Sequence, residues 1–349
     1  CTNPSEDVEH QTAQVPEQTD TPREAAAEKP ESESEPEVEP DPVTLFVYSN
    51  SGYKPEDFDA TFRWAIESEF PHITINYRMK ETGFTMQDLV ATRNIPDIIR
   101  TDIPTLHADY LGMEIGTDLN PFVDKFDYNL KRFNSAFIQE ILEAGQTDAL
   151  YGLPVSPYYP VALYYNKELF ENFGVPYPED GMTWDEVYEV AQTMTRTADG
   201  TIYRGFSSNV NTALRDNTLS LPILDPSSDG LADMEQWQLM FNNLKRFYEL
   251  PNNEIGESAS AENNAFNQGN VAMQLFGFSA QIPIPEFDWD MVSMPVMEGA
   301  PAVVPQRAPA YWSIANTSEH KDEAFQVIMQ MLSDEPSMKA SRAGNPTTL

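Results

Sequence analysis

The organisation of this 349-residue chain is decided by the stretch Tyr151-Gly-Leu-Pro-Val-Ser-Pro-Tyr-Tyr-Pro-Val-Ala-Leu-Tyr-Tyr-Asn-Lys-Glu-Leu-Phe-Glu-Asn-Phe-Gly-Val-Pro176. Two apolar segments flank Tyr158-Tyr159-Pro160, and this pattern predicts two short strands. Proline fixes its own backbone φ, so the residues between the strands form a rigid bend. The pattern therefore predicts that the chain leaves one sheet here, with two tyrosine hydroxyls beside the bend.

The region before this stretch alternates between predicted strands and helices. Buried-strand runs occur at residues 43–48, 73–77 and 96–99, and helical patterns begin at Pro55 and Met86. Short links between such elements predict right-handed crossovers and a mostly parallel sheet. Ligands of parallel sheets bind outside the carboxyl ends of the strands. We therefore expect residues 48–52 and 100–102 at the rim of a binding site.

The region after the stretch is mainly helical. Thr183-Trp-Asp-Glu186 has the pattern of a capping box, which predicts a helix start and a packing role for Trp184. Two more helices are predicted at residues 234–248, with Phe241 among the apolar positions, and at residues 318–332.

Several segments together resemble a known family. They include Tyr165-Asn-Lys167 before a Leu-Phe helix, Thr183-Trp184, Phe266-Asn-Gln-Gly-Asn-Val-Ala-Met273 and Ser313-Ile-Ala-Asn316. This set is similar to the family 1 extracellular solute-binding proteins, the sugar-capturing lipoproteins of bacterial ABC importers. The resemblance implies an α/β, two-lobed periplasmic-binding-protein-like fold with mostly parallel sheets flanked by helices and a ligand cleft between the lobes.

The resemblance also implies a division of the chain. Residues 43–157 and about 285–325 are expected to form the N-terminal lobe, and about 158–284 with 326–349 the C-terminal lobe. Family members usually continue beyond the position of Gly344-Asn-Pro346, so we expect the sequence to be incomplete at its C-terminus.

The expected ligand contacts follow the family by position. Aromatic faces pack on the C–H faces of sugar rings, while hydroxyl and amide groups bind their oxygens. Core packing is the alternative for Tyr158 and Tyr159, and also for Tyr311 and Trp312. Phe278 stands where relatives often carry a stacking Trp. The candidate ligand residues are Asn50, Ser51, Thr101, Asp102, Tyr158, Tyr159, Ser207, Asn209, Phe278, Tyr311 and Trp312.

Composition excludes several classes of function. The net charge is −35, and a chain this acidic repels phosphate backbones, so we expect no nucleic-acid partner. The four histidines are scattered and there is one cysteine, so no metal site and no cofactor is expected. At long range the acidic body also disfavours anionic sugars. We therefore expect a neutral oligosaccharide, although Arg100, Arg204 or Arg307 offers a local contact for a uronate.

The only cysteine is Cys1, and residues 2–42 are rich in Glu, Asp, Pro, Ser and Thr. Such a composition predicts a disordered tether. A lone cysteine ahead of it resembles the acylated residue of a bacterial lipoprotein, where two acyl chains give a stable anchor. We expect a monomer lipid-anchored on the extracellular face of a Gram-positive cytoplasmic membrane.

The leading hypothesis is a protein that is not an enzyme, captures a carbohydrate and delivers it to the permease subunits of an ABC transporter. An exported glycoside hydrolase is the second hypothesis, which needs two carboxylates about 5–9.5 Å apart. A surface glycan-adhesion lipoprotein is the third. Turnover of a glycan distinguishes the second from the first, and neighbouring permease genes distinguish the third.

Overall fold

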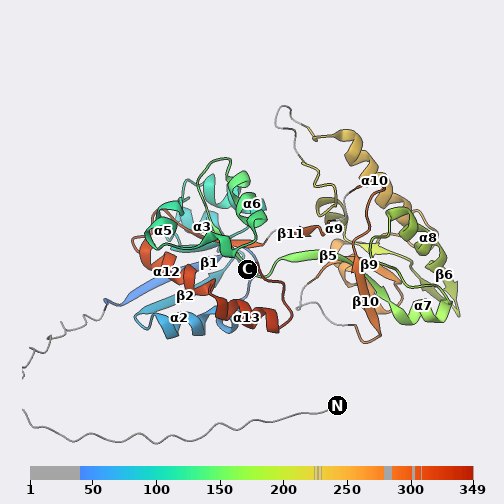
Figure 1. Ribbon diagram of the computed structural model, residues 1–349, viewed down its shortest axis with the longest axis horizontal. Coiled ribbons are helices and arrows are strands. Elements are labelled where there is room, and N and C mark those ends of the chain that lie inside the picture. Colours follow the sequence, from blue (N-terminus) through green and yellow to red (C-terminus); the bar gives the residue numbers. More distant parts are fainter. Residues whose placement is uncertain are drawn as a thin grey trace, which may run out of the picture. The chain divides into compact units, whose positions relative to one another are not determined.

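The computed structural model describes residues 40–223, 225, 228, 230–278, 285–300, 303–307 and 309–348. The described residues from Asp41 onward form one unit with two principal sheets, each at the centre of its own lobe (Figure 1). No helix among these residues has the length and apolar character needed to cross a membrane. Cys1 and residues 2–39 of the expected tether lie outside the described residues.

The sheet of the first lobe has the strand order β2-β1-β3-β12-β4. Its middle strand, β3, pairs parallel with β1 and antiparallel with β12. The strands are β1 (Val43–Ser49), β2 (Ile73–Met79), β3 (Ile98–Thr101), β4 (Leu153–Val155) and β12 (Ala310–Ile314).

Helices surround this sheet, and Figure 1 shows α2, α5, α6, α12 and α13 around it. A π-helical turn, η1, joins the first two helices into one continuous segment whose Phe58, Phe62 and Ile66 are buried. The helices are α1 (Pro55–Phe58), η1 (Asp59–Arg63), α2 (Trp64–Glu69), α3 (Met86–Ala91), α4 (Ile103–Leu106), η2 (His107–Leu111), α5 (Asn120–Lys125), η3 (Leu130–Arg132), α6 (Ser135–Gly145), α12 (Lys321–Met331) and α13 (Asp334–Arg342).

The sheet of the second lobe has the order β10-β5-β9-β8, and β11 also pairs with β5. The strands are β5 (Tyr159–Asn166), β8 (Ser207–Ser208), β9 (Met273–Gly277), β10 (Trp289–Ser293) and β11 (Gln306–Arg307), with a separate hairpin of β6 (Arg196–Ala198) and β7 (Thr201–Tyr203). The helices are α7 (Lys167–Phe173), α8 (Trp184–Met194), α9 (Val210–Arg215), α10 (Met234–Tyr248), α11 (Ala259–Ala265) and η4 (Phe266–Gln268).

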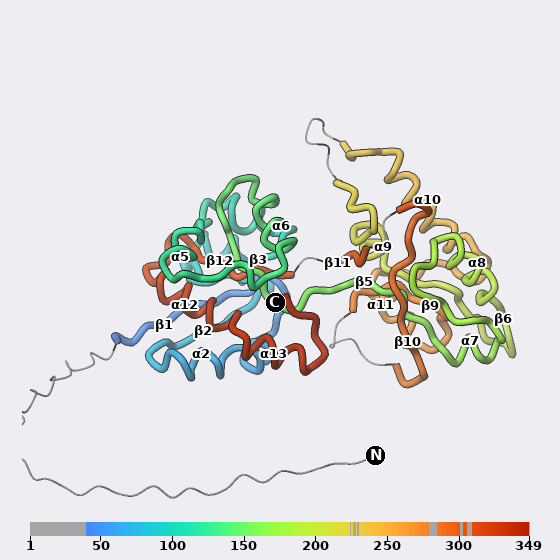
Figure 2. The backbone as a smooth tube through the Cα atoms, in the orientation of Figure 1, coloured from blue at the N-terminus to red at the C-terminus, as the bar shows by residue number. Residues whose placement is uncertain are grey.

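Each lobe has a hydrophobic core of its own. The first core is built on residues of β1, β3, β12 and α12, and the second on residues of β5, α8, α10 and β9. The chain passes from the first sheet to the second between β4 and β5 and returns between β11 and β12, which Figure 2 lets the reader follow. The predicted crossing at Tyr158-Tyr159-Pro160 is therefore confirmed.

Two details of the expected architecture are wrong. The sheets are mixed instead of mostly parallel, because β12 enters the first sheet antiparallel and β5 pairs antiparallel with β9, β10 and β11. The lobe boundaries also differ. β10 belongs to the second sheet, and Phe325, Val327 and Ile328 of α12 are buried in the first core, so the chain after β12 returns to the first lobe.

The predictions of local structure in the second lobe are confirmed, except for the placement of Phe241. The Thr183 hydroxyl accepts the Glu186 N–H and the Glu186 carboxylate accepts the Thr183 N–H, which confirms the capping box. Trp184 is buried and packs edge-on against Phe206 and Phe247, as expected for a packing residue. α10 has the predicted bounds, but Phe241 is half-exposed and lies off its buried face.

Candidate functional site

The crossing between the lobes carries two partly exposed tyrosines. The ring of Tyr158 lies 5.3 Å from that of Phe137 on α6 of the first lobe. Tyr159 is the first residue of β5 and pairs with Arg307 of β11. Both side chains therefore stand where the chain enters the second lobe.

Phe278 lies opposite Pro160 in the pairing of β9 with β5. It follows β9, and its backbone N–H donates to the carbonyl oxygen of Pro160 at 2.7 Å. Gly277 precedes it, and a Cβ added there would lie 3.4 Å from the Cβ of Tyr159. The register of β5 with β9 places Phe278 on the opposite face of the sheet from Tyr159, where it packs against the small core of Tyr164 and Phe266. Both side chains are partly exposed, but the structure does not bring the two rings together.

The loop after β1 supplies polar groups at the carboxyl edge of the first sheet. Asn50 is buried, and its Nδ2 donates to Asp109 Oδ2 at 2.7 Å. Asp109 is itself held by Gln87, whose Nε2 donates to Oδ1 at 2.7 Å. Asn50 Oδ1 has no hydrogen-bond partner among the described residues. Asp109 therefore fixes the amide of Asn50 and leaves its carbonyl oxygen as an unused acceptor.

Ser51 and Asp102 lie at the same edge. Ser51 Oγ accepts a hydrogen bond from Arg100, the penultimate residue of β3. Asp102 caps α4, because its Oδ1 accepts the Thr105 backbone N–H at 3.0 Å and also the Thr105 hydroxyl. The predicted rim of residues 48–52 and 100–102 thus forms one neighbourhood, although Asp102 already has a capping role.

Three expected ligand residues are instead buried in the first lobe. Thr101 is 1% exposed and its hydroxyl bonds Ser313 Oγ at 3.0 Å. Tyr311 is fully buried and donates to the Phe137 carbonyl and the Glu140 carboxylate. Trp312 is fully buried, with its ring edge-on to Phe58 and Phe62. Helices cover both faces of β12, so its successive side chains all point into protein.

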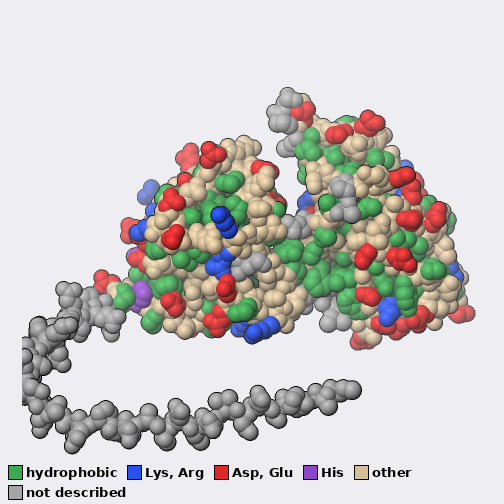
Figure 3. Space-filling view, viewed as in Figure 1, with side chains coloured by type: hydrophobic (Ala, Val, Ile, Leu, Met, Phe, Trp, Pro, Cys, Tyr) green, Lys and Arg blue, Asp and Glu red, His purple; other side chains and the backbone are tan. Residues whose placement is uncertain are grey.

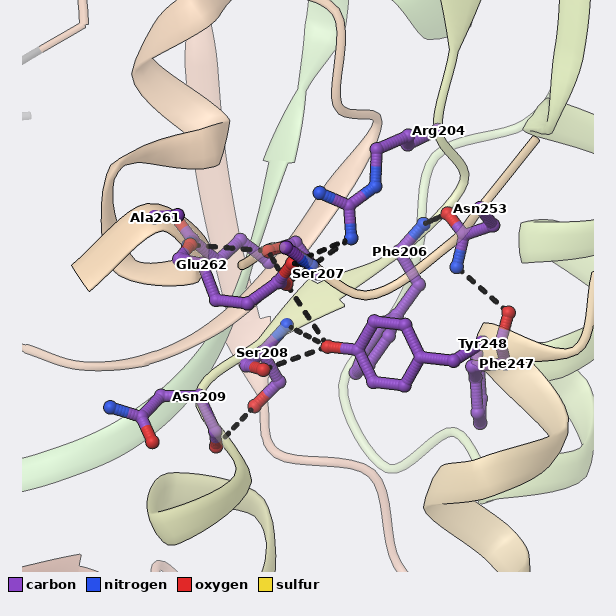
Figure 4. Close-up of polar contacts among 12 residues, drawn as sticks. Arg204, Phe206, Ser207, Ser208, Asn209, Phe247, Tyr248, Asn253, Ala261 and Glu262 are labelled. Atoms are coloured by element: carbon purple, nitrogen blue, oxygen red, sulfur yellow. Dashed lines mark hydrogen bonds and ion pairs between the residues drawn. The ribbon is translucent and has the colours of Figure 1, made fainter. Parts of the chain in front are cut away.

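Ser207 is also placed inside its lobe, in a buried network around Glu262 (Figure 4). The Glu262 carboxylate is 2% exposed and accepts hydrogen bonds from Ser207 Oγ at 2.6 Å and Arg204 Nη2 at 3.0 and 3.2 Å. The Gly256 N–H donates to Oε1, and the Tyr248 hydroxyl lies 3.1 Å from Oε2. No local sequence pattern indicated this network.

The network supports the strand end that carries Asn209. Tyr248 accepts the Ser208 N–H at 2.8 Å, and Asn209 then begins α9 by accepting the Asn211 N–H at 2.9 Å. Asn209 is partly exposed, whereas Ser207 is fully buried. Of the two residues expected here, only Asn209 is accessible to a ligand.

The Glu262 network predicts a pH dependence of stability. Burial alone would raise the pKa of Glu262, but the hydrogen bond from Ser207, the Arg204 charge and the Gly256 N–H together lower it. A depressed folded-state pKa contributes stability above the unfolded value of about 4.3, and this is lost as the pH falls through the folded pKa. We expect the stability advantage of wild type over Glu262→Gln to be constant from about pH 7 to 5 and to shrink below about 4.3.

Urea unfolding of the two proteins at each pH measures this difference, and the common acid sensitivity of the other carboxylates cancels in it. An advantage that stays unchanged down to pH 3 would show that Glu262 has no depressed pKa.

A surface hollow of about 670 Å³ lies between α8 and α10 of the second lobe. It contains the ion pair of Arg246 with Asp185, which are 2.6 Å apart, and the half-exposed Leu239. None of the expected ligand residues lines it, so it is separate from the site at the crossing.

Acidic side chains are spread over the face of the molecule shown in Figure 3. Among the described residues, no group of three or more His, Cys, Asp or Glu side chains is arranged to hold a metal ion. The arrangement at the crossing offers aromatic faces, an amide oxygen, hydroxyls and one guanidinium, which suits a polar organic ligand.

Solved structures with the same two-lobed architecture come from bacterial binding proteins. The ABC substrate-binding protein Lmo0181 of Listeria monocytogenes, in complex with cycloalternan, has a TM-score of 0.71 at 17% identity, covering 88% of this chain and 80% of that one. The GacH receptor of Streptomyces glaucescens, solved unliganded and with acarbose, has a TM-score of 0.68 at 15% identity, covering 88% and 80%. Maltose-bound T. maritima MalE3 has a TM-score of 0.65 at 18% identity, covering 88% and 81%.

These likenesses define the class of fold, a two-lobed binding protein of mixed α/β structure. The family model for the bacterial extracellular solute-binding proteins matches residues 51–338, and the chain belongs to that family. A comparison with curated proteins gave no match.

Proposed function

We propose that this protein captures a carbohydrate outside the cell and delivers it to the permease of an ABC transporter. The observation that carries the proposal is the partly exposed Tyr159 at the crossing, which interacts electrostatically with Arg100 at the carboxyl edge of the first sheet, next to the loop of Asn50 and Ser51. Partly exposed aromatic rings next to an amide oxygen and hydroxyls are the combination that recognises sugars. Three structural neighbours are described in complex with cycloalternan, acarbose and maltose, which supports the same ligand class here.

The two-lobed fold supports a mechanism for capture. Tyr159 belongs to the second lobe, and Asn50 and Ser51 to the first. A ligand that contacts residues of both lobes favours the conformation in which those residues meet, so binding energy shifts the protein toward a closed state. The permease then recognises the closed form. The proposal includes a monomeric protein held at the membrane by a lipid on Cys1, the only cysteine, ahead of an acidic spacer.

A thermal-shift screen of mono-, di- and oligosaccharides tests the proposal. A binder present at 100 times its Kd stabilises the folded state by about 2.7 kcal/mol, which raises the unfolding midpoint measurably. We expect at least one carbohydrate to do so without being cleaved. A midpoint that responds to peptides or polyamines and to no saccharide contradicts the proposal, and turnover of a glycan favours the hydrolase.

The matched variants for this screen are Tyr159→Ala and Tyr177→Ala. Tyr177 lies in the same lobe, is 39% exposed and is outside the candidate site. We expect Tyr159→Ala to weaken binding by roughly 10- to 100-fold, corresponding to one lost aromatic contact of 1–3 kcal/mol. Tyr177→Ala should bind as wild type does. Equal loss in both variants would show that the effect is not local to the site.

A further inference from the structure

Arg100 is the only buried arginine or lysine among the described residues. It is 6% exposed, although it lies at the carboxyl end of β3, beside Asn50 and Ser51. The Asn50 N–H donates to the Arg100 carbonyl oxygen at 3.1 Å, so its backbone position at this edge is fixed. The guanidinium is therefore part of the candidate site and is withdrawn from bulk water.

This guanidinium lacks a carboxylate partner within the described part of the chain. Its only hydrogen bond there goes to Ser51 Oγ, and its Cζ lies 4.7 Å from the ring centroid of Tyr53. Arginine has five N–H donors, and neither a hydroxyl nor an aromatic face neutralises its charge. A buried charge is costly unless it is paired, and the described residues place no carboxylate in ion-pair contact with this guanidinium, so it is suited to pair with an anionic group of a ligand.

Other partly buried arginines show the contrast. Arg204 is paired with Glu262 at 3.0 Å, Arg246 with Asp185 at 2.6 Å, and Arg132 with Asp334 at 2.5 Å. In each case the chain supplies the carboxylate. At Arg100 it does not, and the side chain of Arg307 lies outside the described residues.

The groups that interact electrostatically with Arg100 lie around the crossing. Burial lowers the pKa of Arg100, and Tyr159, Tyr53, Tyr77 and Asp102 act against that effect. Asp102 Oδ1 is engaged in capping α4. Tyr159 is a ligand residue of the proposed site, and its interaction with Arg100 places the guanidinium at the same site.

We propose that Arg100 binds the carboxylate of the ligand, so that the captured carbohydrate is a uronate or another acidic sugar. The planar guanidinium fork matches a carboxylate bidentately. This inference rests on the proposed function and differs from the neutral ligand expected from the net charge of −35. Exposed acids are screened beyond about 8 Å at physiological salt, whereas a buried guanidinium in contact with the ligand is not.

Calorimetry with matched ligands tests the inference on the wild-type protein. The probes are di- and trisaccharides of galacturonate and glucuronate, their methyl esters and the corresponding neutral sugars. The ester keeps the ring and removes the charge. We expect the free acid to bind on the order of 100-fold more tightly than its ester, as for a buried charge pair that loses one partner.

Two variants locate the effect. Arg100→Met removes the charge at similar length and should abolish the preference for the free acid. Arg100→Lys retains the charge without the fork and should keep a reduced preference. Circular dichroism checks that each variant folds. If Arg100→Met does not fold, the ratio of the wild-type affinities for the free acid and its methyl ester tests the inference.

Each outcome has one meaning. Acid preference in wild type that is lost in Arg100→Met supports the inference. Tight binding of neutral sugars, with the acid no better than its ester, overturns the inference and leaves the proposed function standing. Binding of no saccharide of either kind overturns both.

Discussion

Glu262→Ala is expected to lower the free energy of unfolding of the second lobe by about 3–5 kcal/mol, the range for breaking one partner out of a buried ion pair. The carboxylate is 2% exposed and accepts hydrogen bonds from Arg204, Ser207 and Gly256. Alanine leaves the guanidinium without its counter-charge and three donors without an acceptor. Urea unfolding followed through Trp184 and Trp237, which are both in this lobe, measures the effect.

Two controls distinguish the network from general damage. Ser207→Ala removes one hydrogen bond and is expected to cost about 1–3 kcal/mol, because part of the carboxylate is then unsatisfied. Glu257→Ala removes an exposed acid five residues away from Glu262. Its free energy of unfolding should stay within about 0.5 kcal/mol of that of wild type. An effect of Glu262→Ala as small as that of Glu257→Ala would show that the network contributes nothing to stability.

Local sequence patterns predicted local structure well. The capping box at Thr183 could be predicted because its two hydrogen bonds join residues three positions apart. The crossing at Tyr159 could be predicted because proline and flanking apolar runs determine it over a few residues. α10 could be predicted because fifteen residues give a clear helical period.

Long-range placement could not be predicted in the same way. Glu262 lies in a helix of Ala, Ser and Asn, and its partners are 6 to 58 residues away. No local pattern indicates such a network. The direction of β12 depends on which edge of the first sheet it joins, and its antiparallel entry followed from the return of the chain from the second lobe. The lobe boundaries and the mixed sheets were missed for that reason.

The candidate ligand residues show the same division. Position at a strand end predicted the neighbourhood of Asn50, Ser51 and Asp102, because carboxyl ends of parallel strands meet at one edge. Exposure depends on what covers each face of a strand. Tyr311 and Trp312 point to opposite faces of β12, and helices cover both, which a single sequence does not reveal.

Trp312→Ala is the variant that separates a core role from a ligand role most strongly. Trp312 is fully buried and packs edge-on against Phe58 and Phe62, with ring centroids 6.3 and 6.0 Å away. Truncating a buried aromatic to alanine costs about 3–5 kcal/mol through lost burial and the cavity that remains. We therefore expect a loss of that size in the unfolding free energy of the first lobe, measured by urea unfolding with circular dichroism.

Trp312→Phe makes the test specific. The indole Nε1 has no hydrogen-bond partner among the described residues, so phenylalanine loses volume but no hydrogen bond. We expect Trp312→Phe to lower the free energy of unfolding by less than half as much as Trp312→Ala does. Its ligand affinity should equal that of wild type. Tyr159→Ala should show the opposite pattern, with weaker binding and near-normal stability, because its ring is partly exposed. If Trp312→Phe instead lost ligand affinity at unchanged stability, Trp312 would be a ligand contact that becomes accessible when the lobes move.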